Sequence, residues 1–196
     1  PALAVLGAAR VALSPSQGAG PAAGAVVASP ELLQSLRPDK TEPSSNHVPG
    51  RFELGNHGRA NMAGITAAVD HLADLVAGQG DRRERLDRSF AALTLRESDM
   101  VRGTISRLTG IPGVRVVGAP TRRTGTLCFT VDSLGSDEVA ARLGGQGISV
   151  WNGHAYAWEL SRVLGIRDTG GAVRASLSPY TSQSDLDRLV AAVSAL

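Results

Sequence analysis

Short apolar runs separated by turn-forming residues open the chain, and they predict two strands followed by a short helix. The runs are 9–13 and 24–28, and the segment between them is rich in Ser, Gly and Pro, which favours a loop. Ser29, Pro30 and Glu31 then have the order of an N-cap, a first-turn proline and a first-turn acid. We therefore expect a helix from this point to Leu36.

Residues 37–59 have no periodic apolar pattern, and from residue 60 the pattern becomes helical. The long irregular connection is of the kind that is usually functional or lies against a partner. In the helical part, apolar side chains recur at spacings of three and four, which predicts one apolar helix face ending at Gly78 and Gly80. The face comprises Met62, Ile65, Val69, Leu72 and Val76.

A second helix is expected from the mixed-sign charged run at 81–85 to Leu108, with Leu86, Phe90 and Leu93 directed inward and a stop at 110–113. After it, strand and helix patterns alternate. We expect strands at 114–117, 126–131, 148–150 and 172–177, and helices at 136–144, 154–164 and from Ser182 onward, where the order of residues resembles a capping box. The pattern predicts a compact α/β lobe.

The elements suggest three parts, at 1–58, 59–111 and 112–196. The first part is too short to cover both faces of its own strands. We therefore expect it to be covered by a missing amino-terminal segment or by another subunit. The absence of methionine at Pro1 suggests a processed or excised product.

Composition narrows the classes of function. The chain has 196 residues, 42% of them hydrophobic, and a net charge of only +2 without a basic, aromatic-rich run, so we expect no nucleic-acid partner. No apolar stretch has membrane-spanning length, which predicts no membrane partner. The single cysteine, Cys128, fits a reducing, cytoplasmic compartment and is expected to be a buried structural thiol. The four histidines lack metal-ligand spacing, so no metal site is expected.

Three stretches carry the candidate chemistry. The first is Ser14-Pro15-Ser16-Gln17-Gly18-Ala19-Gly20-Pro21-Ala22-Ala23-Gly24, and the second is Pro49-Gly50-Arg51-Phe52-Glu53-Leu54-Gly55-Asn56. The third runs from Gly147 through His154 and Tyr156 to 170–177 and Tyr180-Thr181-Ser182. Taken in this order, they resemble the aminotransferase class V family, in particular its cysteine-desulfurase-like branch.

The resemblance implies the carboxy-terminal part of a pyridoxal-phosphate (PLP) dependent transferase of fold type I. Residues 1–58 would be a remnant of the large PLP-binding domain, 59–111 connecting helices and 112–196 the small α/β domain. Gln17 occupies the position of the family's Schiff-base lysine. An amide is neither nucleophilic nor basic, so covalent PLP binding is not expected. Lys40, the only lysine, would serve only if its loop folded into the site.

The resemblance also assigns roles to other residues. Ser14, Ser16, Gly55 and Asn56 would contact the cofactor, although the family has threonine at the position of Asn56. Arg174 would grip a substrate carboxylate, and His154 and Trp151 would line the mouth of the site. The alternative for Arg174 is a surface arginine on an edge strand, and Arg51 and Glu53 could simply pair with each other. Tyr156 stands where well-known desulfurases carry their persulfide-forming cysteine, and a phenol cannot carry a persulfide.

Three functions remain open from the sequence. The chain is a segment of a PLP enzyme acting on a small amino acid, by C–S bond cleavage or related chemistry, and is not competent alone. Alternatively, it is a non-catalytic pseudoenzyme, or an assembly domain of a larger biosynthetic protein. Gln17 is then either a natural loss or an engineered change. The family resemblance implies a dimer or another homo- or hetero-oligomer.

Overall fold

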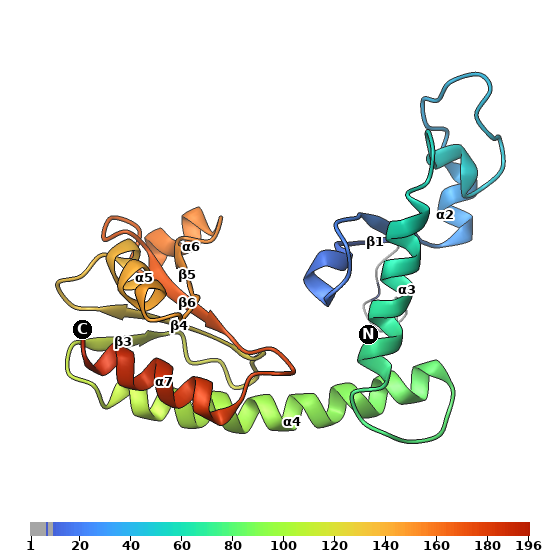
Figure 1. Cartoon of the computed structure of the whole chain (residues 1–196). Helices are drawn as coiled ribbons and strands as arrows, with labels where there is room; N and C mark the ends of the chain where they lie inside the picture. The colour runs from blue at the N-terminus through green and yellow to red at the C-terminus, as the bar shows by residue number, and fades with distance from the viewer. Residues whose placement is uncertain (1–6, 8–9) are drawn as a thin grey trace. The chain divides into compact units, whose positions relative to one another are not determined.

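The computed structural model describes residues 7 and 10–196, and it divides into two compact units, Pro1–Ser89 and Phe90–Leu196 (Figure 1). Each unit is a mixture of helices and strands. No helix among the described residues has both the length and the apolar character needed to cross a bilayer.

Unit 1 begins with an antiparallel pair of strands, β1 (Arg10–Leu13) and β2 (Ala25–Ala28). A single 3-10 turn, η1 (Pro15–Gly18), lies in the loop between them. Helix α2 (Pro30–Ser35) follows, and Ser29 Oγ accepts the N–H of Leu32 at 3.2 Å, so the expected N-cap is confirmed. The connection to the next long helix is irregular apart from the short η2 turn (Gly50–Phe52), as the sequence predicts.

Two long helices follow, α3 (Arg59–Ala73) and α4 (Arg82–Thr109). The prediction that the first continues to Gly78 is wrong, because Asp74 already closes the helix by donating its N–H to the carbonyls of Asp70 and His71. The inward orientation expected for Phe90 is also wrong, since this residue is 49% exposed, and Met62 on the apolar face of α3 is 57% exposed. Both positions fit the apolar periodicity, but other members of the two sets, such as Ile65 and Leu86, are half-buried, so each face is only partly covered.

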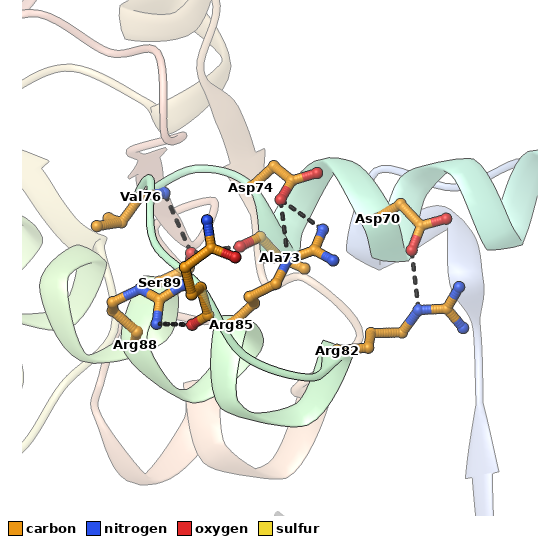
Figure 2. Close-up of polar contacts among 9 residues, drawn as sticks. Asp70, Ala73, Asp74, Val76, Arg82, Arg85, Arg88 and Ser89 are labelled. Carbon is orange, nitrogen blue, oxygen red and sulfur yellow. Dashed lines mark hydrogen bonds and ion pairs between the residues drawn. The ribbon is translucent and has the colours of Figure 1, made fainter.

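Arginines at the start of α4 hold the turn between α3 and α4 (Figure 2). Arg82 pairs with Asp70 at 2.8 Å, and Arg85 pairs with Asp74 at 2.5 Å. Ser89, which is 1% exposed, donates its hydroxyl to the carbonyl of Ala73 at 2.9 Å. The same oxygen accepts the N–H of Val76 at 3.2 Å.

These contacts explain why the chain leaves the helix before Val76. The N–H of Val76 bonds to the Ser89 hydroxyl instead of to a helical carbonyl, which satisfies a part-buried backbone donor outside regular structure. Arg88 adds a hydrogen bond from Nη1 to the carbonyl of Gln79 at 3.1 Å. The turn is therefore fixed by side chains of α4, a long-range relationship that apolar spacing does not encode.

Unit 2 contains a four-stranded sheet with the order β3-β4-β6-β5, in which every neighbouring pair is antiparallel. The strands are β3 (Val114–Val117), β4 (Thr126–Val131), β5 (Trp151–Gly153) and β6 (Ala172–Ser176). The prediction of a strand at 148–150 is wrong, because the strand lies three residues later, at β5. Ile148 donates its N–H back to the carbonyl of Leu143 at 3.0 Å, which commits it to the end of the preceding helix.

Helices α4, α5 (Ser136–Gly145) and α7 (Gln183–Ser194) cover one face of this sheet. Side chains alternate between the two faces of a strand, so the buried Leu127, Phe129, Val173 and Ala175 all belong to that core face. The capping box expected at Ser182 is confirmed, with Asp185 as its acidic partner.

Helix α6 (Trp158–Val163) is shorter than the helix expected at 154–164. Ala155 and Tyr156 have φ values of 48° and 62°, and two consecutive left-handed residues cannot belong to a right-handed helix. A turn closed by the Ala157 N–H and the His154 carbonyl at 2.8 Å replaces the first part of the expected helix. The fold class is nevertheless the predicted one, a mixed α/β chain. The division at 58 and 111 stays a prediction.

Candidate functional site

Gln17 lies on a tight turn at the end of β1. Its N–H donates to the carbonyl of Ser14 at 3.0 Å, and the N–H of Gly20 closes the turn on the carbonyl of Pro15 at 2.9 Å. A Cβ at Gly20 would lie only 2.9 Å from that Pro15 oxygen, so the close approach requires glycine. The turn presents the exposed Gln17 side chain to solvent.

Of the four residues expected to contact the cofactor, the structure brings Ser14 and Ser16 together. The hydroxyls of Ser14 and Ser16 lie 3.0 Å apart on the η1 turn. Gly55 and Asn56 are exposed in the loop that precedes α3, with Gly55 at a φ of 79°. Within the described residues, no hydrogen bond joins this loop to either serine.

Helix α3 instead contacts the segment that follows the η1 turn. Asn61 Nδ2 donates to the carbonyl of Ala22 at 3.1 Å. A Cβ at Gly64 would lie 3.1 Å from the Pro21 ring, so this glycine allows the helix to approach the loop. The packing gives the loop around Gln17 a fixed support.

Three charged residues of the irregular connection are committed to local contacts. Lys40 Nζ donates to the carbonyl of Ser44 at 2.9 Å, within its own loop. Arg51 Nη1 donates to the carbonyl of Leu36 at 3.2 Å, and Glu53 pairs with His57 at 3.3 Å. The alternative in which Arg51 pairs with Glu53 is therefore wrong, because each residue has a different partner.

In unit 2, Arg174 lies in the middle of a row that crosses the sheet. The strand register places Cys128 of β4 and Trp151 of β5 on either side of Arg174. These residues alternate with the buried core positions, so the row belongs to the sheet face that α4, α5 and α7 do not cover. The Arg174 guanidinium carbon lies 6.0 Å from the centre of the Trp151 ring.

The alternative reading of Arg174 as an edge-strand residue is wrong, because β6 lies between β4 and β5. The side chain is exposed, and within the described residues no ion pair joins it to a carboxylate. A guanidinium fixed on an interior strand with free donors suits a planar carboxylate, which it can bind through two parallel hydrogen bonds.

Cys128 is half-buried rather than fully buried as the sequence suggests. Burial raises the pKa of its thiol above the ordinary value of 9.0, and the nearby charges of Arg174 and Arg123 offset part of that rise. Since the net shift is upward, the thiol is protonated at neutral pH, which agrees with a structural role rather than a nucleophilic one.

His154 belongs to an aromatic cluster that includes Trp158. Its ring meets that of Trp158 edge-on, with centroids 4.9 Å apart, and the guanidinium carbon of Arg167 lies 4.9 Å from the Trp158 centroid. Tyr156 is 95% exposed on the adjoining turn. Trp158 and Arg167 are not among the site residues expected from the sequence, although the i,i+4 spacing of His154 and Trp158 in the expected helix would also have brought their side chains together.

Covalent binding of PLP requires an amine that can form a Schiff base with its aldehyde. At the η1 turn the residue presented is an amide, which forms no Schiff base, and Lys40 is hydrogen-bonded inside its own loop. The described residues therefore do not fit covalent capture of PLP. They do fit recognition of a carboxylate at Arg174.

Comparison with known proteins places these features in a family. The family model for aminotransferase class V matches residues 23–189. An uncharacterized protein of Mycobacterium tuberculosis is 32% identical over 182 residues, covering 90% of this chain and 44% of that protein. A probable cysteine desulfurase of Staphylococcus epidermidis is 26% identical over 175 residues, covering 83% of this chain and 38% of that protein.

Solved structures agree on the fold. The crystal structure of the cysteine desulfurase CsdA from Escherichia coli matches with a TM-score of 0.80 at 24% identity, covering 97% of this chain and 46% of that one. A mutant of the lyase C-DES, with glycine covalently linked to its PLP cofactor, matches with a TM-score of 0.62 at 22% identity and covers 90% of this chain and 43% of that one. The chain spans less than half the length of these relatives. By its sequence match and its fold, the chain belongs to the cysteine-desulfurase-like proteins of the aminotransferase class V family.

Proposed function

We propose that this chain is the carboxy-terminal part of a class V protein that recognises a small amino acid by its carboxylate but does not attach PLP covalently. The observation that carries the proposal is the η1 turn, which presents Gln17 where the family resemblance places a lysine. Without an amine at this position, the chain alone does not support C–S bond cleavage or related chemistry.

Carboxylate recognition rests on Arg174 and its neighbours. The side chain is exposed on an interior strand, beside the half-exposed Trp151 ring, and within the described part of the chain it pairs with no acid. The bidentate geometry of guanidinium suits a carboxylate. The aromatic ring offers apolar area to the rest of a small ligand.

The absence of covalent attachment is tested with PLP and borohydride. The wild-type chain, treated with both reagents and then digested, should yield no modified peptide containing residue 17, whereas Gln17→Lys should yield one. A Lys40→Arg variant separates any adduct on the only lysine from one at the turn. A cofactor adduct at Lys40 of the wild-type chain, with an absorbance band lost in Lys40→Arg, would overturn the proposal.

Carboxylate recognition is tested by NMR on the Trp151 indole. Adding L-alanine should shift the indole signal, whereas L-alaninamide, which lacks the carboxylate, should not. Arg174→Gln should abolish the shift. Arg142→Gln, which removes an arginine paired with Glu138 on α5, should leave it unchanged. Equal shifts with the acid and the amide would contradict recognition through Arg174.

A second proposal concerns partners. The two strands of unit 1 form a sheet of only two members within the described residues, and their side chains Leu13, Val26 and Val27 are 51%, 69% and 43% exposed. Exposed apolar area of this kind favours association, which supports an oligomer or a partner chain. We expect native mass spectrometry to show a species heavier than the monomer, and a strictly monomeric protein at micromolar concentration would refute this.

A further inference from the structure

A broad groove in unit 2 lies between α4 and the loop that joins β3 to β4. Its volume is about 840 Å³, and its lining combines residues of α4 between Thr94 and Ile105 with the loop at 118–124. None of its residues belongs to the sheet-face row around Arg174. The groove therefore has its own lining residues, although the charge of Arg123 also acts on Cys128 in that row.

Positive charge dominates the lining of this groove. Arg102 comes from α4, Arg122 and Arg123 come from the loop, and no acidic residue is among the lining side chains. Two acids of α4 lie close by. Asp99 pairs with Arg102 at 3.4 Å on the exposed helix surface and offsets part of its charge, and Glu97 accepts the N–H of Gly125 at 3.1 Å.

Arg123 carries an unsatisfied donor in the wall of the groove. Its Nη2 donates to the carbonyl of Gly118 at 3.3 Å, which ties the guanidinium to the start of the loop. Its Nη1 is buried and has no hydrogen-bond partner among the described residues. A buried charged donor without an acceptor is costly, so an anionic oxygen supplied by a ligand would lower the free energy of this arrangement.

The rest of the lining suits a ligand that is partly polar and partly apolar. The hydroxyls of Ser98 and Thr124 lie in the groove and have no hydrogen bond within the described residues, so they remain available to anionic oxygens. Ile105 and Pro120 supply apolar area. Ligand sites in proteins combine apolar walls with a few polar groups of this kind.

We propose that this groove binds a phosphate-bearing small molecule, with Arg102, Arg122 and Arg123 holding the phosphate oxygens. Guanidinium groups bind phosphate through paired hydrogen bonds, and three of them around one concavity match a group of two or more negative charges. A nucleic acid is a poorer match, because the chain carries a net charge of only +2 and lacks an extended basic surface.

The test is calorimetric titration of the full chain with inorganic pyrophosphate and with ATP, using acetate and an aspartate-rich peptide as comparisons. If only the phosphate group is recognised, the two phosphate probes bind equally. If the apolar wall contributes, ATP binds more tightly. Either result supports the proposal. Tighter binding of the acidic peptide than of both phosphate probes would overturn it, as would no binding of either probe at millimolar concentration.

Variants decide whether the arginines of the groove are responsible. Arg102→Gln combined with Arg122→Gln should weaken pyrophosphate binding at least about tenfold, since hydrogen bonds to charged groups are the strong ones. The pair Arg102→Lys and Arg122→Lys keeps the charge but loses the paired donors, and it should bind with intermediate affinity. Arg142→Gln is the matched control on α5. Unchanged affinity in the double glutamine variant would refute the proposal.

Arg123→Gln tests the unsatisfied donor itself. Because this change also removes the contact with Gly118, its folding is checked by circular dichroism, and the double variant remains decisive if the loop is disturbed. The amino-acid response of the Trp151 indole should survive in the variants of Arg102 and Arg122. The two proposals therefore fail independently of each other.

Discussion

Gly171 passes so close to the backbone of Gly153 that no side chain fits on Gly171, whereas the Cβ position of Gly153 is open. A Cβ built on Gly171 would lie 2.2 Å from the carbonyl carbon of Gly153, and the φ of Gly171 is 83°. Gly153 ends β5, and Gly171 immediately precedes β6, so this contact joins the strand of Trp151 to the strand of Arg174.

Gly171→Ala should be strongly destabilising, by roughly 3 kcal/mol or more, because the new methyl group overlaps backbone atoms that cannot move aside. Gly165→Ala is the matched control. It also has a positive φ, of 68°, but nothing lies within 4 Å of its Cβ position. It should cost only the left-handed penalty of about 1–2 kcal/mol. Urea unfolding of both variants measures the difference in the free energy of unfolding. Equal losses of stability would show that the contact with Gly153 does not contribute to the cost of Gly171→Ala.

Ser89→Ala should destabilise the chain by about 1–3 kcal/mol, because it leaves the carbonyl of Ala73 and the N–H of Val76 without their partner in a buried turn. Chemical unfolding followed by circular dichroism gives the change. Ser106→Ala, at an exposed position of the same helix, should have an effect within about 0.5 kcal/mol. A loss no greater than that of Ser106→Ala would contradict the role assigned to the Ser89 hydroxyl.

Asp185 gives the start of α7 a dependence on pH. Hydrogen bonds from the N–H of Ser182 and from its hydroxyl lower the pKa of this carboxyl below its ordinary value of 3.8. A lowered pKa in the folded state means that the stabilisation is complete above the unfolded value and is lost as pH falls through the folded value. The urea midpoint of the wild type should exceed that of Asp185→Asn at pH 7, and the gap should shrink below about pH 4.

The capping geometry also provides the control for this prediction. Ser182→Ala removes the hydroxyl but leaves the backbone N–H that bonds Asp185 at 2.8 Å, so part of the pH dependence should remain. If the difference in urea midpoint between wild type and Asp185→Asn stayed constant from pH 7 to pH 2, the carboxylate could not be its source.

Cys128 should react slowly with iodoacetamide at neutral pH, since burial raises the pKa of its thiol and reaction requires the thiolate. Arg174 and Arg123 lower that pKa, so Arg174→Gln should raise it further and slow alkylation at pH 8. The pH profile of the alkylation rate, followed by mass spectrometry, measures both effects. Arg142→Gln should match the wild type, and faster alkylation in Arg174→Gln would reverse the assigned electrostatics.

The sequence predicts much of the fold because the relevant signals are local. The N-cap at Ser29, the capping box at Ser182 and the strand at 126–131 each depend on residues a few positions apart, and the structure confirms all three. The early end of α3 is different, because the hydroxyl of Ser89 lies thirteen positions from the Val76 N–H that it accepts. The spacing of apolar residues cannot predict a contact between two such positions.

The sequence predicts only part of the candidate site, for the same reason. The family resemblance draws attention to Arg174 and Trp151, and the strand register pairs these two positions. It gives no indication that Cys128 is the other neighbour of Arg174, because pairing between β4 and β6 joins positions that are far apart in the chain. The resemblance also places His154 at the mouth of the site, which stays a prediction, whereas the helix expected from 154 begins later because two left-handed residues precede it.

The interior position of β6 has a consequence for how the sheet tolerates change. A strand that is hydrogen-bonded along both edges cannot slide or twist without opening two ladders at once. The backbone under Arg174 is therefore among the least adjustable parts of this unit. Selection for a different ligand would act more easily on the segments that flank β5 and β6, where glycines and exposed aromatic rings leave freedom to vary, than on the strand that carries the guanidinium.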